Sequence, residues 1–167
     1  MAERVSLTVS AATLEWEPAE LLRGADRADP AEPAAWALAG GCDWTSIESL
    51  RVISACFGDT AVAIAIARPA GAAGADADRV AGVRLAPGGP ESVDDALVST
   101  EYDSNGVVRR IGVELWPQSG TARRLAADRA GEPQTTAADG IRREATPMAF
   151  RLDGERGTGL HELVRPA

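Results

Sequence analysis

Residues 47–68, IESLRVISACFGDTAVAIAIAR, decide the fold class of this 167-residue chain. The first half is rich in branched residues, and the second half places Val62, Ile64 and Ile66 on one face, opposite a row of alanines. This alternation has a period of two residues, which indicates β-strands. A Gly-Asp pair at 58–59 is a turn signal, so the stretch predicts a β-hairpin. The alanine face leaves unusual space, or it allows a neighbouring layer to approach closely.

The period of two continues on both sides of this hairpin. Further strands are predicted at 5–9, 14–16, 79–86, 93–102, 107–116, 148–152 and 160–165. Residues 121–130 are ambiguous, because their composition favours a helix and their position favours a strand. Loops or turns are predicted at 70–78, 87–92, 103–106, 117–120, 132–140 and 153–159. From residue 40 onward turns recur about every 10 to 15 residues, which is typical of a meander sandwich or an up-and-down barrel.

We therefore predict one all-β domain over residues 1–167, built as a single antiparallel β-barrel. Residues 18–35 differ from the rest because they hold three prolines. They are expected to form a connection or a short helix that caps one mouth of the barrel. The low-complexity segment 70–78 is expected to be a flexible loop.

The charge of the chain argues against several classes of partner. Acidic residues number 25 against 17 basic ones, giving a net charge of −8, and no cluster of positive charge is visible. Nucleic acid and membrane are therefore not expected as partners. No apolar run approaches the roughly 20 residues of a spanning helix, and no secretory signal is recognisable, so a cytoplasmic location is expected. All basic residues are arginine, which excludes lysine chemistry and suggests a GC-rich, bacterial source.

Common catalytic motifs are missing. His161 is the one histidine, and no G-x-S-x-G elbow accompanies it. Cys42 and Cys56 lack zinc-site spacing and form no disulfide framework, so whether they pair is left open. The glycine-rich segments do not lie between a strand and a helix, as phosphate-binding loops must. We expect neither a cofactor nor a metal.

Aromatic residues and carboxylates supply the candidate site. The chain has 33 alanines and only seven aromatic residues, four of them tryptophan, so a full core is hard to build and an internal cavity is plausible. A carboxylate pointing into an apolar cavity would have a raised pKa and could act as acid or base. An inward arginine from the Arg109-Arg110 pair would suit a carboxylate or enolate oxygen.

Three segments resemble the lipocalin-like domain of the carotenoid 1,2-hydratase (hydroxyneurosporene synthase) superfamily. They are residues 41–44 (GCDW), 101–106 (EYDSNG) and 152–162 (LDGERGTGLHE). The family's Asp-x-Ser-Trp-Gly element is replaced here by residues 37–40 (ALAG), and the family usually has two such domains with a site between them. Only Asp43, Trp44 and Glu162 occupy matching positions.

The resemblance implies a barrel that holds a hydrophobic ligand without a cofactor. Relatives of this architecture include hydratases of isoprenoids and cyclases of polyketides, some of them [4+2] cyclases. A cycloaddition needs a cavity that folds its substrate rather than a nucleophile or a metal, which suits this sequence. Our hypothesis is a cofactor-independent cyclase or isomerase of the Diels–Alder type, acting on a polyketide-like intermediate in bacterial natural-product biosynthesis.

Three alternatives stay open. One is a hydrophobic small-molecule binding protein without chemistry, and another is a hydratase of an isoprenoid-like substrate that uses a buried carboxylate. The last is a subunit that pairs its edge strands with a second copy as a homodimer. The predicted catalytic residues are Glu114, Arg110 and Glu162. The predicted substrate-binding residues are Trp16, Trp44, Tyr102, Trp116, Asp43 and His161.

Overall fold

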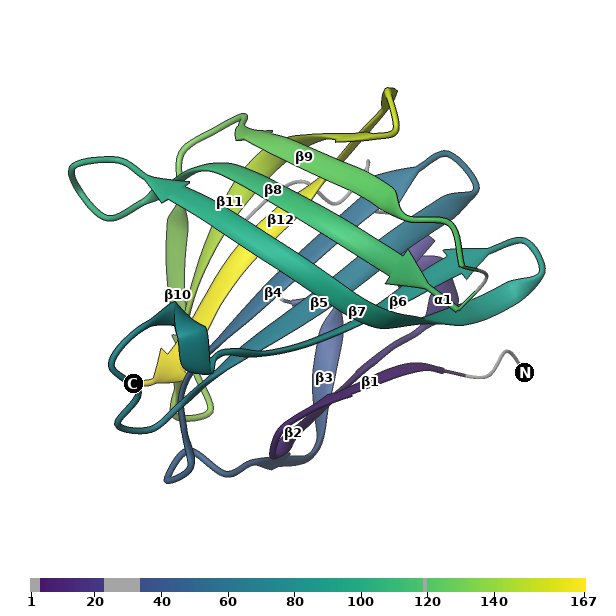
Figure 1. Ribbon diagram of the computed structural model, residues 1–167. Helices are drawn as coiled ribbons and strands as arrows, with labels where there is room; N and C mark the ends of the chain where they lie inside the picture. The colour runs from purple at the N-terminus through teal and green to yellow at the C-terminus, as the bar shows by residue number, and fades with distance from the viewer. Residues whose placement is uncertain (1–3, 23–33, 119) are drawn as a thin grey trace.

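The computed structural model describes residues 4–22, 34–118 and 120–167 (Figure 1). It contains one short helix, α1 (Pro18–Leu22), and a 3-10 turn, η1 (Ala75–Ala77). Its strands are β1 (Val5–Val9), β2 (Ala12–Trp16), β3 (Trp36–Cys42), β4 (Ile47–Phe57), β5 (Thr60–Pro69), β6 (Arg79–Ala86), β7 (Gly89–Tyr102), β8 (Val108–Pro117), β9 (Arg123–Arg129), β10 (Gln134–Ala138), β11 (Ile141–Leu152) and β12 (Glu155–Pro166). No helix within the described residues is long and apolar enough to cross a membrane.

Eight antiparallel strands form a closed barrel, as predicted. Their order is β11-β12-β4-β5-β6-β7-β8-β9, and pairing of β9 with residues 148–152 of β11 closes the ring. β10 pairs with the first part of β11, at residues 141–145, and extends the sheet beyond the barrel. In Figure 1 the strands β7, β8 and β9 cross in front of β4 and β5, which gives the barrel two layers around a common interior.

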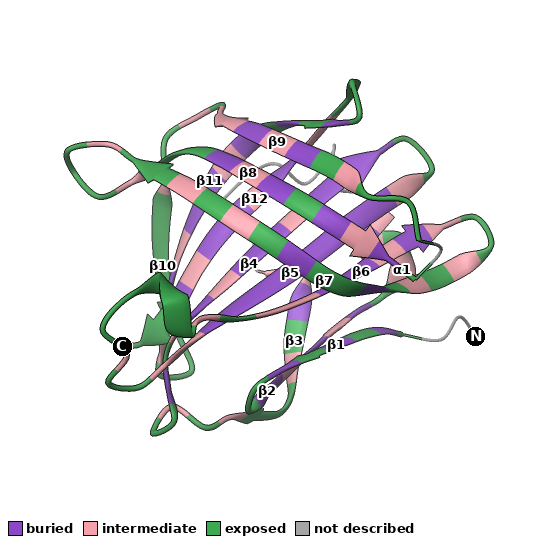
Figure 2. Ribbon diagram, viewed as in Figure 1, coloured by how far each residue is buried: buried purple, intermediate pink, exposed green. Residues whose placement is uncertain are grey.

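Alternation along the strands separates the barrel interior from its surface. Along β8 and β9, buried residues alternate with more exposed ones (Figure 2), because one face of these strands meets solvent. β5 is buried at seven consecutive positions, from Ala61 to Ala67. A strand that is buried on both faces must have a second layer outside it.

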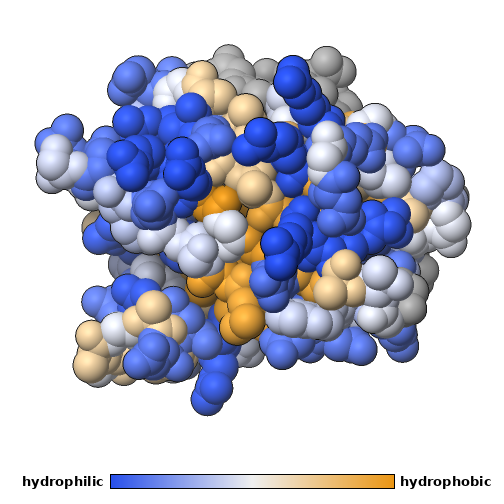
Figure 3. All heavy atoms as spheres, turned by 45° about the horizontal axis from the view of Figure 1, so that its top comes forward, coloured by the Kyte–Doolittle hydropathy of each residue, from blue (hydrophilic) through white to orange (hydrophobic). Residues whose placement is uncertain are grey.

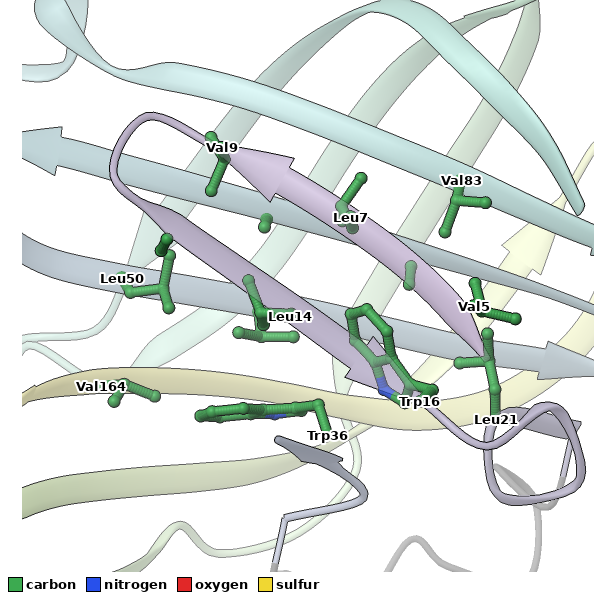
Figure 4. Close-up of a cluster of buried hydrophobic side chains, with 14 of the residues drawn as sticks. Val5, Leu7, Val9, Leu14, Trp16, Leu21, Trp36, Leu50, Val83 and Val164 are labelled. Carbon is green, nitrogen blue, oxygen red and sulfur yellow. The ribbon is translucent and has the colours of Figure 1, made fainter. Parts of the chain in front are cut away.

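That second layer is a three-stranded sheet, β1-β2-β3, which lies against the outer face of β4, β5 and β12. Leu7, Leu14 and Trp16 of this sheet share a buried cluster with four alanines of β5, at positions 61, 63, 65 and 67 (Figure 4). Val62, Ile64 and Ile66 point the other way, into the barrel. The alanine face therefore allows the close approach of a neighbouring layer, one of the two readings left open by the sequence.

Two glycines let β12 cross close to β4. A Cβ atom on Gly159 would lie 1.8 Å from the backbone oxygen of Ser54, and one on Gly157 would lie 2.3 Å from that of Cys56. No side chain fits at these distances, so the Gly-Thr-Gly sequence at 157–159 has a steric cause.

Several boundaries differ from the sequence prediction: β3 lies where no strand is predicted, β7 begins inside the predicted loop at 87–92, and β11 begins at Ile141 rather than at 148. The predicted loop at 132–140 contains the strand β10, and β12 begins at Glu155 inside the predicted turn at 153–159. Both segments are polar or glycine-rich, but their backbones pair with β11. The ambiguous segment 121–130 contains β9, because strand pairing on both sides overrides its helical composition.

The two predicted connections are partly structured. Residues 18–35 begin with α1, which packs on β4 and β5, and residues 23–33 of this segment lie outside the described part of the chain. Segment 70–78 contains η1. Asp78, the last residue of the segment, accepts two hydrogen bonds from Arg68, at 2.9 and 3.0 Å.

Hydrophilic side chains dominate the face of the molecule seen in Figure 3. In the view of Figure 3, an apolar area lies between hydrophilic side chains. Among the described residues, the large hydrophobic side chains that are exposed belong to Leu97, at 62%, and Tyr102, at 50%. The outer face of β7, β8 and β9 carries cross-strand ion pairs such as Arg110 with Asp128.

The alanine face predicts a strong penalty for added volume. Ala63→Leu should lower the free energy of unfolding by about 1–3 kcal/mol, because the outer sheet must move away from β5 to make room. Ala149→Leu is the matched control, since Ala149 is exposed on β11, and its effect should stay within about 0.5 kcal/mol. Urea unfolding measures both, and equal effects of the two substitutions would contradict close packing at β5.

Candidate functional site

One end of the barrel is open and polar, whereas the rest of its interior is filled. At the open end β4 begins and β5, β7 and β12 end, and a pocket of about 540 Å³ lies there. We term it the mouth pocket; its lining includes Arg51, Arg68, Asp78, Tyr102, Leu163 and Arg165. Deeper in the barrel, buried apolar side chains pack against one another, among them Ile53, Phe57, Ile64, Ile111, Leu125 and Met148. The mouth pocket therefore offers a ligand space beside polar side chains at one end of the barrel.

Arg51 is the central polar residue of the mouth pocket. It lies two residues before Ile53 on β4 and so shares the inward face of that strand. Its Nε donates a hydrogen bond to His161 Nε2 at 3.0 Å, and its Nη2 donates one to Thr100 Oγ1 at 2.6 Å. Burial lowers the pKa of Arg51, but an arginine keeps its charge at neutral pH.

The charge of Arg51 is not balanced by a carboxylate at contact distance. None of the ion pairs formed between described residues includes Arg51. The carboxylate of Asp78, in the pocket wall, accepts two hydrogen bonds from Arg68, so the charge of Arg68 already balances it. Arg51 instead donates to two neutral acceptors, which use two of the five N–H donors of a guanidinium.

His161 is held in its neutral form. Its side chain lies inside the barrel and is only 4% exposed. Burial, and then the charge of Arg51, lower its pKa to about 3. Because Nε2 accepts the hydrogen bond from Arg51, the ring proton is on Nδ1. His161 is therefore a hydrogen-bond acceptor that orients Arg51, and it is not an acid at neutral pH.

Two further residues complete this end of the barrel. Thr146 lies directly opposite His161 on β11, is 1% exposed, and has no hydrogen-bond partner for its Oγ1. Tyr102 lies half exposed in the pocket wall. The mouth pocket thus combines a half-buried cation with an aromatic wall, and the orphaned hydroxyl of Thr146 lies opposite His161, the partner of that cation.

A second depression lies outside the barrel wall, between β3 and the β10–β11 hairpin. Its volume is about 600 Å³. We term it the side cleft; its lining includes Trp36, Leu38, Cys42, Trp44, Ile141 and Arg143. β3 and β10 are each the last strand of their sheet, so the cleft separates two sheet edges.

A buried ion pair lies beneath the side cleft. Glu162, 2% exposed, accepts hydrogen bonds from Trp36 Nε1 at 3.1 Å and from Arg143 Nε. The Arg143 side chain is 8% exposed. Glu162 points outward from the barrel because its neighbour His161 points inward.

The predicted site residues are distributed over five places. Tyr102 lines the mouth pocket, where His161 bonds to Arg51, whereas Trp44 lines the side cleft, where Glu162 bonds to Trp36. Asp43 is exposed in the turn before β4, where hydrogen bonds from Thr45 and Ser46 lower its pKa. Trp16 is 1% exposed and packs in the layer between the outer sheet and the barrel.

Arg110, Glu114 and Trp116 lie on the outer face of β8, away from the barrel interior. Ile111, Val113 and Leu115 occupy the inward positions of that strand, so positions 110, 112, 114 and 116 point out. The side chains of Arg110 and Glu114 are 63% and 48% exposed. The alternation predicted for β8 is confirmed from residue 110 onward but is wrong at 108–109, where Val108 is buried and Arg109 is exposed, and the polar face of the strand meets solvent.

Arg51, Thr100, Thr146 and Arg143 were not among the predicted site residues. The signal that could have identified Arg51 is its place in the alternation of β4. It is a charged residue on the same strand face as Ile53 and Phe57, which point into the barrel. The partners of Arg51 come from β7 and β12, far away in sequence, and no local pattern links them.

The two cysteines, Cys42 and Cys56, are free thiols in separate places. Cys42 is half-buried, and burial, with the charge of Asp43, raises its pKa. Cys56 is buried, and its Sγ lies 2.9 Å from the backbone oxygen of Leu22. Within residues 4–22, 34–118 and 120–167, no three His, Cys, Asp or Glu side chains gather in a way that could hold a metal ion.

The closed barrel and its open mouth define a lipocalin-like fold. Among solved structures, the chain resembles kievitone hydratase from Nectria haematococca, with a TM-score of 0.50 and 7% sequence identity. The match covers 81% of this chain and 46% of that hydratase, so the chain spans less than half of the hydratase's length. No family model and no curated protein sequence matches the chain. The likeness supports the barrel fold.

The lowered pKa of His161 predicts how stability depends on pH. The folded protein keeps His161 neutral down to about pH 3, whereas the unfolded chain binds a proton near pH 6.5. The unfolded state therefore gains the proton first, and the free energy of unfolding should fall as the pH decreases below 6.5, by up to about 1.4 kcal/mol per pH unit. His161→Gln should flatten this slope between about pH 6 and 4.5, above the range in which Asp43 and Asp103 titrate.

Two measurements check this prediction. Urea unfolding at several pH values gives the slope for both proteins. Because the chain has one histidine, NMR of the imidazole gives its pKa and tautomer directly. A midpoint near 6.5 in the folded protein would contradict the buried, neutral ring.

Proposed function

We propose that this protein binds a hydrophobic small molecule through an anionic or enolate oxygen, which contacts Arg51 in the mouth pocket. The observation that carries the proposal is a half-buried guanidinium that lines the pocket and forms no ion pair with a described carboxylate at contact distance. Removing a charge from water, even in part, costs free energy unless the charge is paired. A ligand oxygen would supply the missing negative charge.

The surroundings of Arg51 support this proposal. Hydrogen bonds to His161 and Thr100 hold the guanidinium in one orientation, so little rotational freedom is lost when a ligand binds. Ile66, Tyr102 and Leu163 give the pocket apolar walls. The chain as a whole has a net charge of −8, so only a local positive centre would attract an anion.

If the ligand reacts, the chemistry that fits is a cofactor-free cyclisation or isomerisation. Arg51 would stabilise negative charge on a carbonyl oxygen of a polyketide-like chain as that charge develops. Hydration needs a proton donor, and neutral His161 is a poor one, while Glu162 lies outside the barrel wall in an ion pair. These observations favour electrostatic stabilisation over acid–base hydration.

A matched pair of probes tests the binding of the anion. Titration calorimetry with 2-naphthoate and 2-naphthamide compares ligands that share a ring system and differ in charge. The naphthoate should bind about tenfold to a hundredfold more tightly, as expected for hydrogen bonds to a charged group. Arg51→Met, which removes the charge and keeps an unbranched chain, should abolish the difference.

Arg124→Met is the control, because Arg124 is 85% exposed on the outer face and its loss should leave the preference unchanged. Thermal unfolding of each variant separates loss of binding from loss of folding. Equal affinities of the two probes for the unmodified protein would refute the proposal.

A gene deletion in the native host distinguishes catalysis from ligand binding alone. A strain without the gene is compared with its parent by mass spectrometry of solvent extracts. Accumulation of a linear isomer of equal mass indicates a cyclase or isomerase, and a difference of one water indicates a hydratase. An unchanged metabolite profile with a ligand bound to the purified protein indicates a binding protein.

A further inference from the structure

We infer that the side cleft is a second ligand site, separate from the mouth pocket, and that it takes a neutral, flat, conjugated molecule. The cleft has a volume of about 600 Å³, which lies within the usual range of small-molecule pockets, roughly 300–1,000 Å³. Its walls come from β3 and the turn after it on one side and from the β10–β11 hairpin on the other.

The composition of the walls indicates an apolar, planar ligand. Trp36 and Trp44 line the cleft, together with Leu38 and Ile141. An indole offers a large rigid face on which another ring system can stack. Trp36 is fixed by two contacts, because its Nε1 donates to Glu162 and, in Figure 4, its ring lies beside Val164.

The charges beneath the cleft indicate a neutral ligand. Arg143 and Glu162 form an ion pair, so the cation and the anion compensate each other. A second anion on Arg143 would compete with a carboxylate that is already buried and bonded, and Asp139 at the rim would repel it. The mouth pocket shows the opposite arrangement, since Arg51 forms no ion pair with a described carboxylate at contact distance.

The inward and outward positions of β12 keep the two sites apart. His161 contacts Arg51 inside the barrel, and Glu162 contacts Trp36 and Arg143 outside it. The barrel wall therefore lies between them, and a ligand in one site does not touch the residues of the other. This inference stands without the proposed function of the mouth pocket.

The test uses N-phenyl-1-naphthylamine, a neutral aromatic probe whose fluorescence rises in apolar surroundings. Saturable binding is expected, and Trp44→Ala should weaken it at least about fivefold by removing one stacking face. Leu97→Ala is the control for unspecific adhesion, because Leu97 is an exposed apolar residue on β7. Arg51→Met should bind the probe like the unmodified protein.

Cys42 locates the bound probe without any substitution. It lines the cleft, whereas Cys56 is buried elsewhere. Because the pKa of Cys42 is raised, iodoacetamide labelling is carried out near pH 9 and followed by peptide mapping. The probe should slow the labelling of Cys42 at least about fivefold, as about 80% occupancy would, whereas 2-naphthoate should not.

Two results would overturn the inference. One is the absence of saturable binding to the folded protein. The other is binding that leaves the labelling rate of Cys42 unchanged or that depends on Leu97 rather than on Trp44. If 2-naphthoate still binds more tightly than 2-naphthamide in either case, the proposal for the mouth pocket stands and only the inference about the side cleft is refuted.

Discussion

The contact between the outer sheet and the alanine face of β5 determines the rest of the structure. Methyl groups at four alternate positions let β1, β2 and β3 lie directly on the barrel wall. The outer sheet then covers β4 and β12 as well, which buries Glu162 and Trp36. It also brings the edge strand β3 beside the β10–β11 hairpin, and the side cleft is the space that remains. Larger residues on β5 would separate these layers.

The two ends of the barrel interior differ in the side chains that occupy them. At one end, phenylalanine, isoleucine, leucine and methionine fill the space between eight strands. At the other end, Arg51 and His161 replace apolar residues at inward positions and hold each other by a hydrogen bond. Filling one end gives the domain a rigid core, and the polar end can then hold charge without a carboxylate.

Much of the fold follows from alternation in the sequence. The hairpin of β4 and β5, the strands β1 and β6, and the turn at 103–106 are found where the pattern predicts them, whereas β3 is not predicted. Alternation gives the two faces of a strand but does not say which one points inward, because that depends on barrel closure. In β8, the residues Arg110 and Glu114, which the sequence predicts as catalytic, face solvent. For β10, pairing with β11 stabilised a strand whose own residues are polar and small.

The adjacency of His161 and Glu162 has a consequence for how such a protein can evolve. His161 contacts Arg51 on the inner side of β12, and Glu162 contacts Arg143 on its outer side. Point substitutions can therefore alter the mouth pocket and the side cleft independently. An insertion or deletion of a single residue upstream in β12 would instead exchange the two sides. It would place the carboxylate in the lumen beside Arg51 and expose the imidazole to Arg143. Both sites would be lost in one event, so the length of this strand should be far less free to vary than its composition.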